Sequence, residues 1–74
     1  MIKMKYKKIS LMNNCALLAE SLFVEFRCSK NGISIKNLND EWKFFHIDYI
    51  YLHIDKVKKY IKRCAEPELQ TRFI

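Results

Sequence analysis

The chain has 74 residues, of which half are apolar and 14% aromatic, and it carries fourteen lysines and arginines against eight carboxylates. This length allows a single domain, and the apolar and aromatic content is too high for a disordered chain. The net charge of +6 favours an anionic partner such as a nucleic acid over a cationic one.

Residues 2–7 alternate between apolar and basic side chains. Ile2, Met4 and Tyr6 fall on one side, and Lys3, Lys5 and Lys7 fall on the other. Alternation of this kind predicts a half-buried strand with a basic outer face. Residues 15–21 fit either a short helix capped by Asn14 or a loop, because their helix propensity is high but so short a helix needs tertiary support.

A β-hairpin is predicted next. Residues 22–28 alternate again, with Phe23, Glu25 and Arg27 on the outer face of the second strand. The following Asn31-Gly32 holds the only glycine of the chain, and this dipeptide favours a two-residue turn with positive φ. A third strand is expected over residues 33–37 and a loop over 37–40. Residues 42–47 fit a fourth strand or a direct entry into a helix.

From Asp48 onward the apolar residues are spaced by three and four. The stripe consists of Ile47, Ile50, Tyr51, Ile54, Val57, Tyr60, Ile61 and Cys64. It predicts one long amphipathic helix with Asp48 as N-cap, ending at or before Glu66 because Pro67 disfavours a helical residue before it. The expected fold class is therefore α+β, a three- to four-stranded antiparallel sheet followed by one long C-terminal amphipathic helix. Residues 1–66 form the single domain and 67–74 a C-terminal tail.

Catalytic and metal-binding motifs are not expected. No cysteine lies near His46 or His53 in the sequence at the spacing that metal ligands require. A chain with one glycine has no glycine-rich phosphate loop. We therefore predict a non-enzymatic protein without a cofactor or metal. Three cysteines without a CxxC pair indicate free thiols in a reducing intracellular compartment, and no apolar run is long enough to span a membrane.

Single-stranded nucleic acid is the partner that the pattern favours. Lysines at every second position of the first strand would lie about 7 Å apart on one face, close to the spacing of successive phosphates. Arg27 adds a cation and Phe23 a ring on which a base could stack, which is the usual combination for single-strand binding. A solvated sheet face is the alternative for these same residues.

Four short segments and one tryptophan occur in an order that resembles the positive cofactor four family. They are Lys3-Met4-Lys5-Tyr6, Val24-Glu25-Phe26-Arg27, Gly32-Ile33-Ser34-Ile35, Trp42 and Ile54-Asp55-Lys56-Val57. The members of that family are small coactivator-like proteins that bind single-stranded DNA. The resemblance implies a curved four-stranded sheet followed by one helix, pairing of two copies through their helices, DNA running over the sheets and a role in transcription regulation.

The resemblance carries over five binding residues, Lys3, Lys5, Arg27, Lys30 and Trp42. For Trp42 a place in the core is favoured over a stacking surface. The second hypothesis is a protein-binding regulator or inhibitor, of viral or mobile-element type, that acts through an exposed aromatic and basic patch including Phe23.

Overall fold

The computed structural model describes residues 2–65, and for residues 2–5 the backbone only. The elements in chain order are α1 (Ile2–Ser21), β1 (Phe26–Ser29), β2 (Gly32–Lys36), β3 (Trp42–His46), α2 (Ile47–Leu52) and α3 (Ile54–Cys64). The predicted fold class is wrong, because a helix precedes the sheet and two helices follow it. The expected tail, 67–74, lies outside the described residues.

The N-terminal segment is a 20-residue helix and not the predicted strand. The six residues that alternate are too few to separate a strand from a helix. Farther along, the buried Met12, Cys15 and Ala19 are spaced by three and four, which is helical spacing. This stripe lets α1 pack on the other elements and extends the helix through residues 15–21. The helical alternative for that segment is therefore confirmed, but the predicted cap is wrong because Asn14 lies inside the helix.

The end of α1 explains why the second strand is shorter than predicted. The Val24 N–H donates to the Ala19 carbonyl at 2.8 Å and the Phe23 N–H donates to the Glu20 carbonyl at 3.1 Å. These two bonds form a Schellman cap, in which the residue after the helix adopts positive φ and is usually glycine. Here that residue is Phe23, with φ of 59°. Residues 22–25 therefore belong to the helix cap and its exit, and the strand begins only at Phe26.

The predicted hairpin is confirmed, although its turn lies one residue earlier than expected. In the antiparallel pair of β1 and β2, Ser29 faces Gly32, so Lys30 and Asn31 form the two-residue loop. Neither of them has positive φ, so the predicted mirror-image turn at Asn31-Gly32 is wrong. Trp42–His46 forms β3 on the other side of β2, which confirms the additional strand of the sheet.

Gly32 is required by close packing against β3. A Cβ at this position would overlap the carbonyl oxygen of Phe45 and lie 2.9 Å from the Phe44 ring. The Phe44 ring therefore covers the glycine on the outer side of the sheet. The backbone also has φ of 157° there, at the edge of the region that favours glycine.

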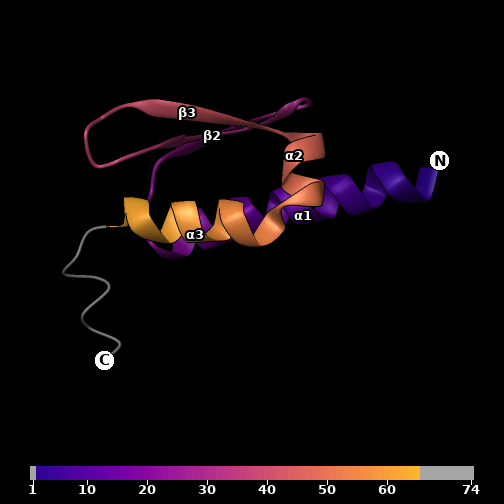
Figure 1. The fold of residues 1–74 in the computed structure, drawn as a ribbon, viewed down its shortest axis with the longest axis horizontal. Coiled ribbons are helices and arrows are strands. Elements are labelled where there is room, and N and C mark those ends of the chain that lie inside the picture. Colours follow the sequence, from indigo (N-terminus) through magenta and orange to yellow (C-terminus); the bar gives the residue numbers. More distant parts are fainter. Residues whose placement is uncertain (1, 66–74) are drawn as a thin grey trace.

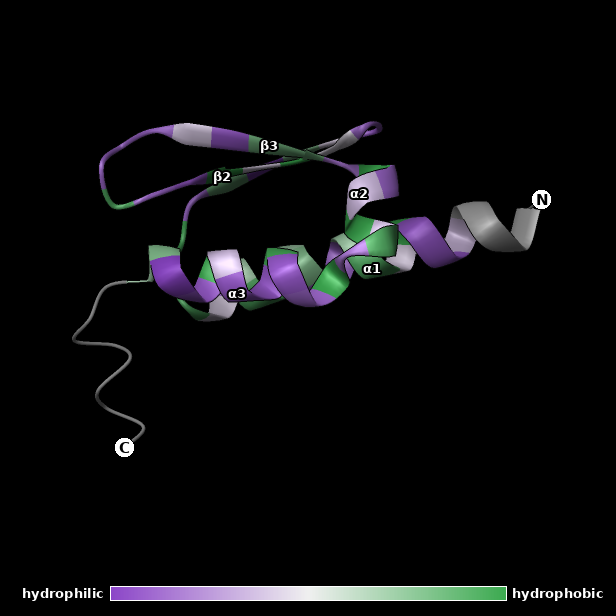
Figure 2. Ribbon diagram, in the orientation of Figure 1, coloured by the Kyte–Doolittle hydropathy of each residue, from purple (hydrophilic) through white to green (hydrophobic). Residues whose placement is uncertain are grey.

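The molecule has two layers, and the core lies between them. In Figure 1, α1 and α3 run side by side in the same direction under the three-stranded sheet, and α2 connects β3 to α3 at one end. The largest fully buried side chains are Ile33 and Ile35 from β2, Ile50 from α2, Val57 and Ile61 from α3, and Cys15 from α1. Hydrophobic and hydrophilic residues alternate around α3 in Figure 2, as expected for a helix with one buried side.

The predicted single C-terminal helix is broken at His53, which has φ of −135° and ψ of 46°. The His53 N–H still donates to the Tyr49 carbonyl, which ends α2, and its carbonyl accepts from the Lys56 N–H at 3.0 Å, which begins α3. Both helices bury the same apolar stripe. The spacing of that stripe therefore could not reveal the bend. The predicted C-terminal end is correct, since α3 ends at Cys64.

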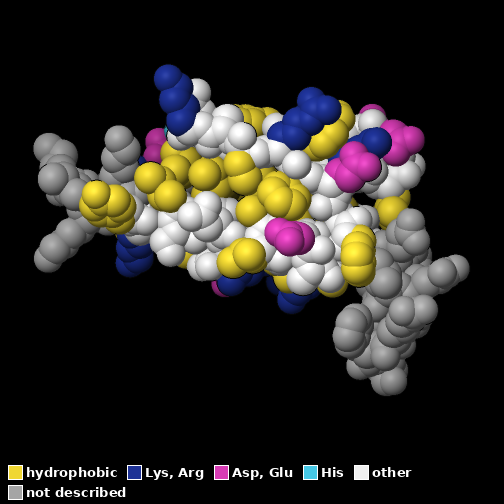
Figure 3. Space-filling view, turned by 180° about the vertical axis from the view of Figure 1, so that it is seen from behind, with side chains coloured by type: hydrophobic (Ala, Val, Ile, Leu, Met, Phe, Trp, Pro, Cys, Tyr) yellow, Lys and Arg dark blue, Asp and Glu magenta, His cyan; other side chains and the backbone are white. Residues whose placement is uncertain are grey.

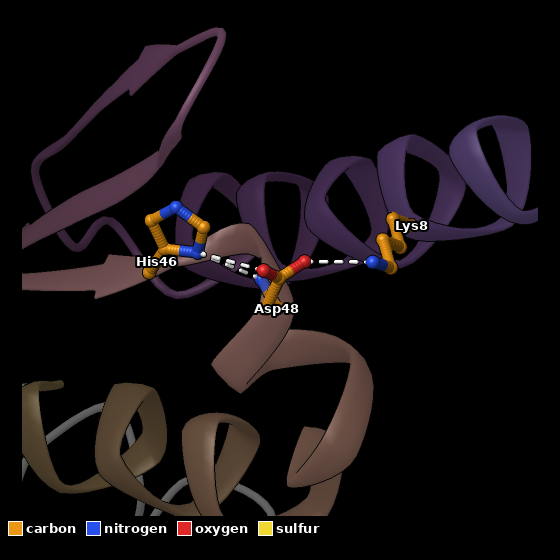
Figure 4. Close-up of polar contacts among 3 residues, drawn as sticks. All are labelled: Lys8, His46 and Asp48. Carbon is orange, nitrogen blue, oxygen red and sulfur yellow. Dashed lines mark hydrogen bonds and ion pairs between the residues drawn. The ribbon is translucent and has the colours of Figure 1, made fainter.

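The N-cap of α2 is His46 and not Asp48. The Asp48 N–H donates to Nδ1 of His46 at 3.1 Å, and the Asp48 carboxylate accepts from Nζ of Lys8 at 2.7 Å. Figure 4 shows Asp48 between the histidine and the lysine. Because Lys8 lies on α1, this small network ties the junction of β3 and α2 to the N-terminal helix. The hydrogen bond from Lys8 lowers the pKa of Asp48.

Candidate functional site

The predicted lysine row on a sheet face does not form. Lys3, Lys5 and Lys7 belong to α1, where residues two apart do not share a face. The side chains of Lys3 and Lys5 are outside the described part of the chain. Nζ of Lys7 lies 5.8 Å from the centre of the Tyr51 ring, and Lys30 is exposed in the hairpin loop.

Three other predicted residues come together. Phe23, Arg27 and Trp42 line one open hollow of about 430 Å³, although they come from the cap of α1, from β1 and from β3. We call this hollow, whose lining consists of Glu20, Phe23, Val24, Glu25, Phe26, Arg27 and Trp42, the aromatic hollow. Trp42 is 41% exposed, so its expected place in the core is wrong, and the Arg27 guanidinium carbon lies 4.7 Å from the centre of its ring.

The charges around the aromatic hollow are of both signs. Glu20 and Glu25 contribute two carboxylates to its lining. Nζ of the neighbouring Lys36 lies 3.5 Å from Glu25 and 3.4 Å from Asp40, and the hydrogen bond to Asp40 raises the pKa of Lys36. Two carboxylates beside one guanidinium give little attraction for a phosphate backbone.

A second concave surface lies where β3, α2 and α3 meet. Its lining combines four cations with three rings, and no carboxylate of the described residues contributes to it. We call this surface, lined by Lys43, Phe45, Tyr49, Lys56, Lys59, Tyr60 and Arg63, the basic groove. Its volume is about 210 Å³. A further hollow of about 340 Å³, lined by Lys43, Phe44, Phe45, His46 and Tyr49, continues it along β3.

Helical spacing places the cations of the groove in a row. Lys56, Lys59 and Arg63 are three and four residues apart on α3, so they share one face of the helix. Their backbones are about 4.5 Å and 6 Å apart along the axis. That spacing is similar to the distance between successive phosphates of an extended strand. The buried Val57 and Ile61 fix which face of α3 remains outside.

The rings of the groove differ in exposure and therefore in what they can contact. Phe45 is buried and packs edge-on against Tyr60 with ring centres 5.2 Å apart. Nζ of Lys43 lies 5.6 Å from the centre of the Phe45 ring and 5.3 Å from that of Tyr60, so cation–π attraction holds the ammonium at the groove. Burial raises the pKa of Tyr60.

Tyr49 is the ring that is available to a ligand. It is 40% exposed, and its ring centre lies 4.8 Å from that of His53 and 5.9 Å from that of Phe45. These two ring contacts restrict the tyrosine ring, and part of it remains open to solvent. Such a ring can stack on a nucleobase at little cost in side-chain entropy.

Sequence reasoning missed most of this groove. The one signal of the groove in the sequence is the run of residues 56–63, which holds five cations and no carboxylate and predicts phosphate contacts along the lysine edge of the C-terminal helix. Lys43 and Tyr49 carry no comparable signal, because they reach the groove only when β3 and α2 pack beside α3.

Other site types are not formed by the described residues. No three of their histidine, cysteine and carboxylate side chains group as metal ligands. All three cysteines are unpaired, and burial raises the pKa of the thiols of Cys15 and Cys64. None of the helices within residues 2–65 combines the length and the apolar character needed to cross a membrane.

Comparison with known proteins gave no significant match to a family model, to a curated protein or to a solved structure. The fold implied by the resemblance to the positive cofactor four family, four strands followed by a helix, also differs from the fold observed. The site is therefore interpreted from its own chemistry.

Proposed function

We propose that this protein is a non-enzymatic binder of single-stranded nucleic acid that uses the basic groove. The supporting observation is the lining of that groove, four cations and three rings without a carboxylate of the described residues. The cations of α3 contact successive phosphates, and Tyr49 stacks on a base. This is the same partner that the sequence predicts, placed on a different surface from the one it predicts.

Single-stranded ligands are favoured over duplexes by the shape of the surface. The exposed ring of Tyr49 lies beside the cations, and a base can reach it only when it is unpaired. The outer face of α3 carries mainly lysine and arginine side chains. Such side chains position a phosphate backbone but do not read the base edges of a duplex. Unpaired thiols are compatible with a reducing intracellular compartment.

The primary experiment is fluorescence anisotropy of labelled oligothymidine at several salt concentrations. Lys59→Glu is expected to weaken binding about tenfold or more and to reduce the slope of log affinity against log salt by about one. Lys30→Glu makes the same charge change in the hairpin loop, at a residue that does not line the groove, and is expected to change the affinity much less. Equal losses in the two variants would contradict a role for the groove.

Base stacking has its own test. Tyr49→Leu keeps an apolar side chain against Phe45 but removes the aromatic face, and stacking on one base is worth about 1–3 kcal/mol. The variant should therefore lose roughly tenfold in affinity for oligothymidine at constant salt slope. An abasic oligonucleotide of the same length serves as control, because it should bind wild type and variant alike. Equal binding of oligothymidine by both proteins would exclude the stacking role.

Protein binding is the second candidate function, and the aromatic hollow is the observation that favours it. Its lining has three aromatic side chains and charges of both signs, a composition found at protein interfaces. The pairing of two copies through the C-terminal helix stays a prediction. The apolar side chains of α3, Val57, Ile61 and Cys64, are already buried within one copy, and its outer face is cationic.

A further inference from the structure

Phe23 combines two features that are each unfavourable for a single folded chain. Its φ of 59° places it in the left-handed region, which bulky residues rarely occupy and which the Schellman cap normally gives to glycine. Its side chain is 82% exposed, more than any other large hydrophobic residue among those described. Strained backbone at an exposed position often marks a functional contact.

The structure around Phe23 provides a site that such a ring can fill. The ring stands at the rim of the aromatic hollow, whose walls include Phe26 and Trp42. On its other side lies a second hollow of about 190 Å³ that extends to Leu38, which is 55% exposed. In Figure 3, which views the molecule from behind, hydrophobic side chains form a broad band with carboxylates within it and beside it.

A protruding ring next to a hollow of matching chemistry is self-complementary. When two copies meet about a two-fold axis, each presents the same patch to the other. The ring of the first copy then faces the hollow of the second, and the ring of the second faces the hollow of the first. We infer that two copies of this chain form a symmetric dimer in which the Phe23 ring of each copy enters the aromatic hollow of the other.

Charge identifies the second copy as the occupant. The chain has a net charge of +6, so two copies repel each other at most orientations. The aromatic hollow has two carboxylates and one guanidinium in its lining, and Asp40 lies 3.4 Å from the nearby Lys36. In a symmetric dimer the carboxylates of one patch can therefore lie opposite the guanidinium of the other. A nucleic acid would meet the two carboxylates instead.

The size of the patch is also in the right range. A stable interface buries about 800 Å² on each partner, which is roughly a seventh of the 5744 Å² that the chain exposes. The aromatic hollow alone is too small for this, but Leu38 of the adjoining hollow and Phe44 of β3 are both exposed and add apolar area. Small chains often complete their core by pairing in this way.

Sedimentation equilibrium of the full chain without nucleic acid tests this inference. The wild type should move with concentration from 9.0 kDa toward twice that mass. Phe23→Asn should remain monomeric over the same range, because asparagine tolerates positive φ but cannot fill the hollow. Leu52→Asn removes another exposed leucine, 70% exposed at the end of α2, and should dimerise like the wild type.

Fluorescence of Trp42 gives a second readout, since the chain has one tryptophan. Its emission should shift to shorter wavelength as the wild type dimerises, and the shift should be absent in Phe23→Asn. A wild type that remains at 9.0 kDa at every concentration would overturn the inference. So would a Phe23→Asn variant that dimerises as the wild type does. Both measurements omit nucleic acid, so their outcome is independent of the proposed function.

Discussion

The basic groove and the aromatic hollow are built from the same kinds of residue but differ in their electrostatics. Each has three aromatic side chains in its lining, yet the groove adds four cations and the hollow adds two carboxylates and one guanidinium. Aromatic side chains alone therefore do not identify the ligand of a surface. The charges beside them separate a site for a polyanion from a site for a protein.

Strand β3 connects the two surfaces. Adjacent residues of a strand point to opposite faces, so Trp42 lines the aromatic hollow while Lys43 lines the basic groove. A change that displaces β3 should therefore impair both surfaces, whereas a change on α3 or at the cap of α1 should impair one of them.

The largest loss of stability is expected for Gly32→Ala. This change should displace β3 and thereby impair both the basic groove and the aromatic hollow. The added Cβ would overlap the Phe45 carbonyl and press on the Phe44 ring, and overpacking of this kind costs about 1–3 kcal/mol. Urea unfolding should show a loss at the upper end of this range. Ser34→Ala on the same strand is the control. Equal stability of Gly32→Ala and the wild type would mean that β2 and β3 are not packed as described.

A smaller effect, a gain in stability, is expected for Phe23→Gly. This change acts on the aromatic hollow and leaves the basic groove intact. Glycine relieves the left-handed backbone of the Schellman cap, which costs a bulky residue about 1–2 kcal/mol. The greater chain entropy of glycine offsets about 0.5–1 kcal/mol of this, so a net gain in the unfolding free energy of the monomer is expected. Thermal unfolding at low protein concentration, where wild type and variant are both monomeric, measures this gain. Affinity for oligothymidine should not change. A clear loss of stability would contradict the cap geometry.

The smallest effect concerns the pH dependence of the junction between β3 and α2. The Lys8 hydrogen bond lowers the pKa of Asp48, so the carboxylate stabilises the fold above its ordinary pKa of about 3.9. This contribution is lost as the pH falls through the lower pKa of the folded state. Asp48→Asn should therefore be less stable than the wild type at neutral pH, with a difference that shrinks below about pH 4.

The partner of this ion pair gives the matched control. Lys8→Gln should reduce the pH dependence in the same way, and combining the two changes should add little to either. Parallel pH profiles for the wild type and Asp48→Asn would rule out the proposed ion pair.

The sequence predicts part of this fold correctly, and the errors have physical causes. The hairpin, the strand alternative for residues 42–47 and the end of α3 before the proline at 67 are correct, although the turn chemistry predicted for Asn31-Gly32 is not the one observed. The alternation of residues 2–7 predicts a strand, and this prediction is wrong because six residues carry too little information. The helical spacing of Met12, Cys15 and Ala19 shows only over a longer window. The bend at His53 leaves the apolar stripe intact and is therefore invisible in the pattern.

The residues of the two candidate sites also differ in whether the sequence predicts them. The alternation of residues 22–28 predicts Phe23 and Arg27, the family resemblance alone supplies Trp42, and the fold brings the three together. The groove depends on residues from three elements, and only the run of cations on α3 could be seen in advance. A tertiary site whose members have ordinary local patterns requires the fold before it can be found.

The assignment of nucleic acid to the groove and not to the hollow is tested most directly by a nuclear magnetic resonance titration of the ¹⁵N-labelled chain with oligothymidine. Chemical-shift changes should concentrate at Lys43, Tyr49, Lys56, Lys59 and Arg63, and the Trp42 indole N–H should move little. Changes centred on Phe23, Arg27 and the Trp42 indole, with α3 unaffected, would contradict the assignment.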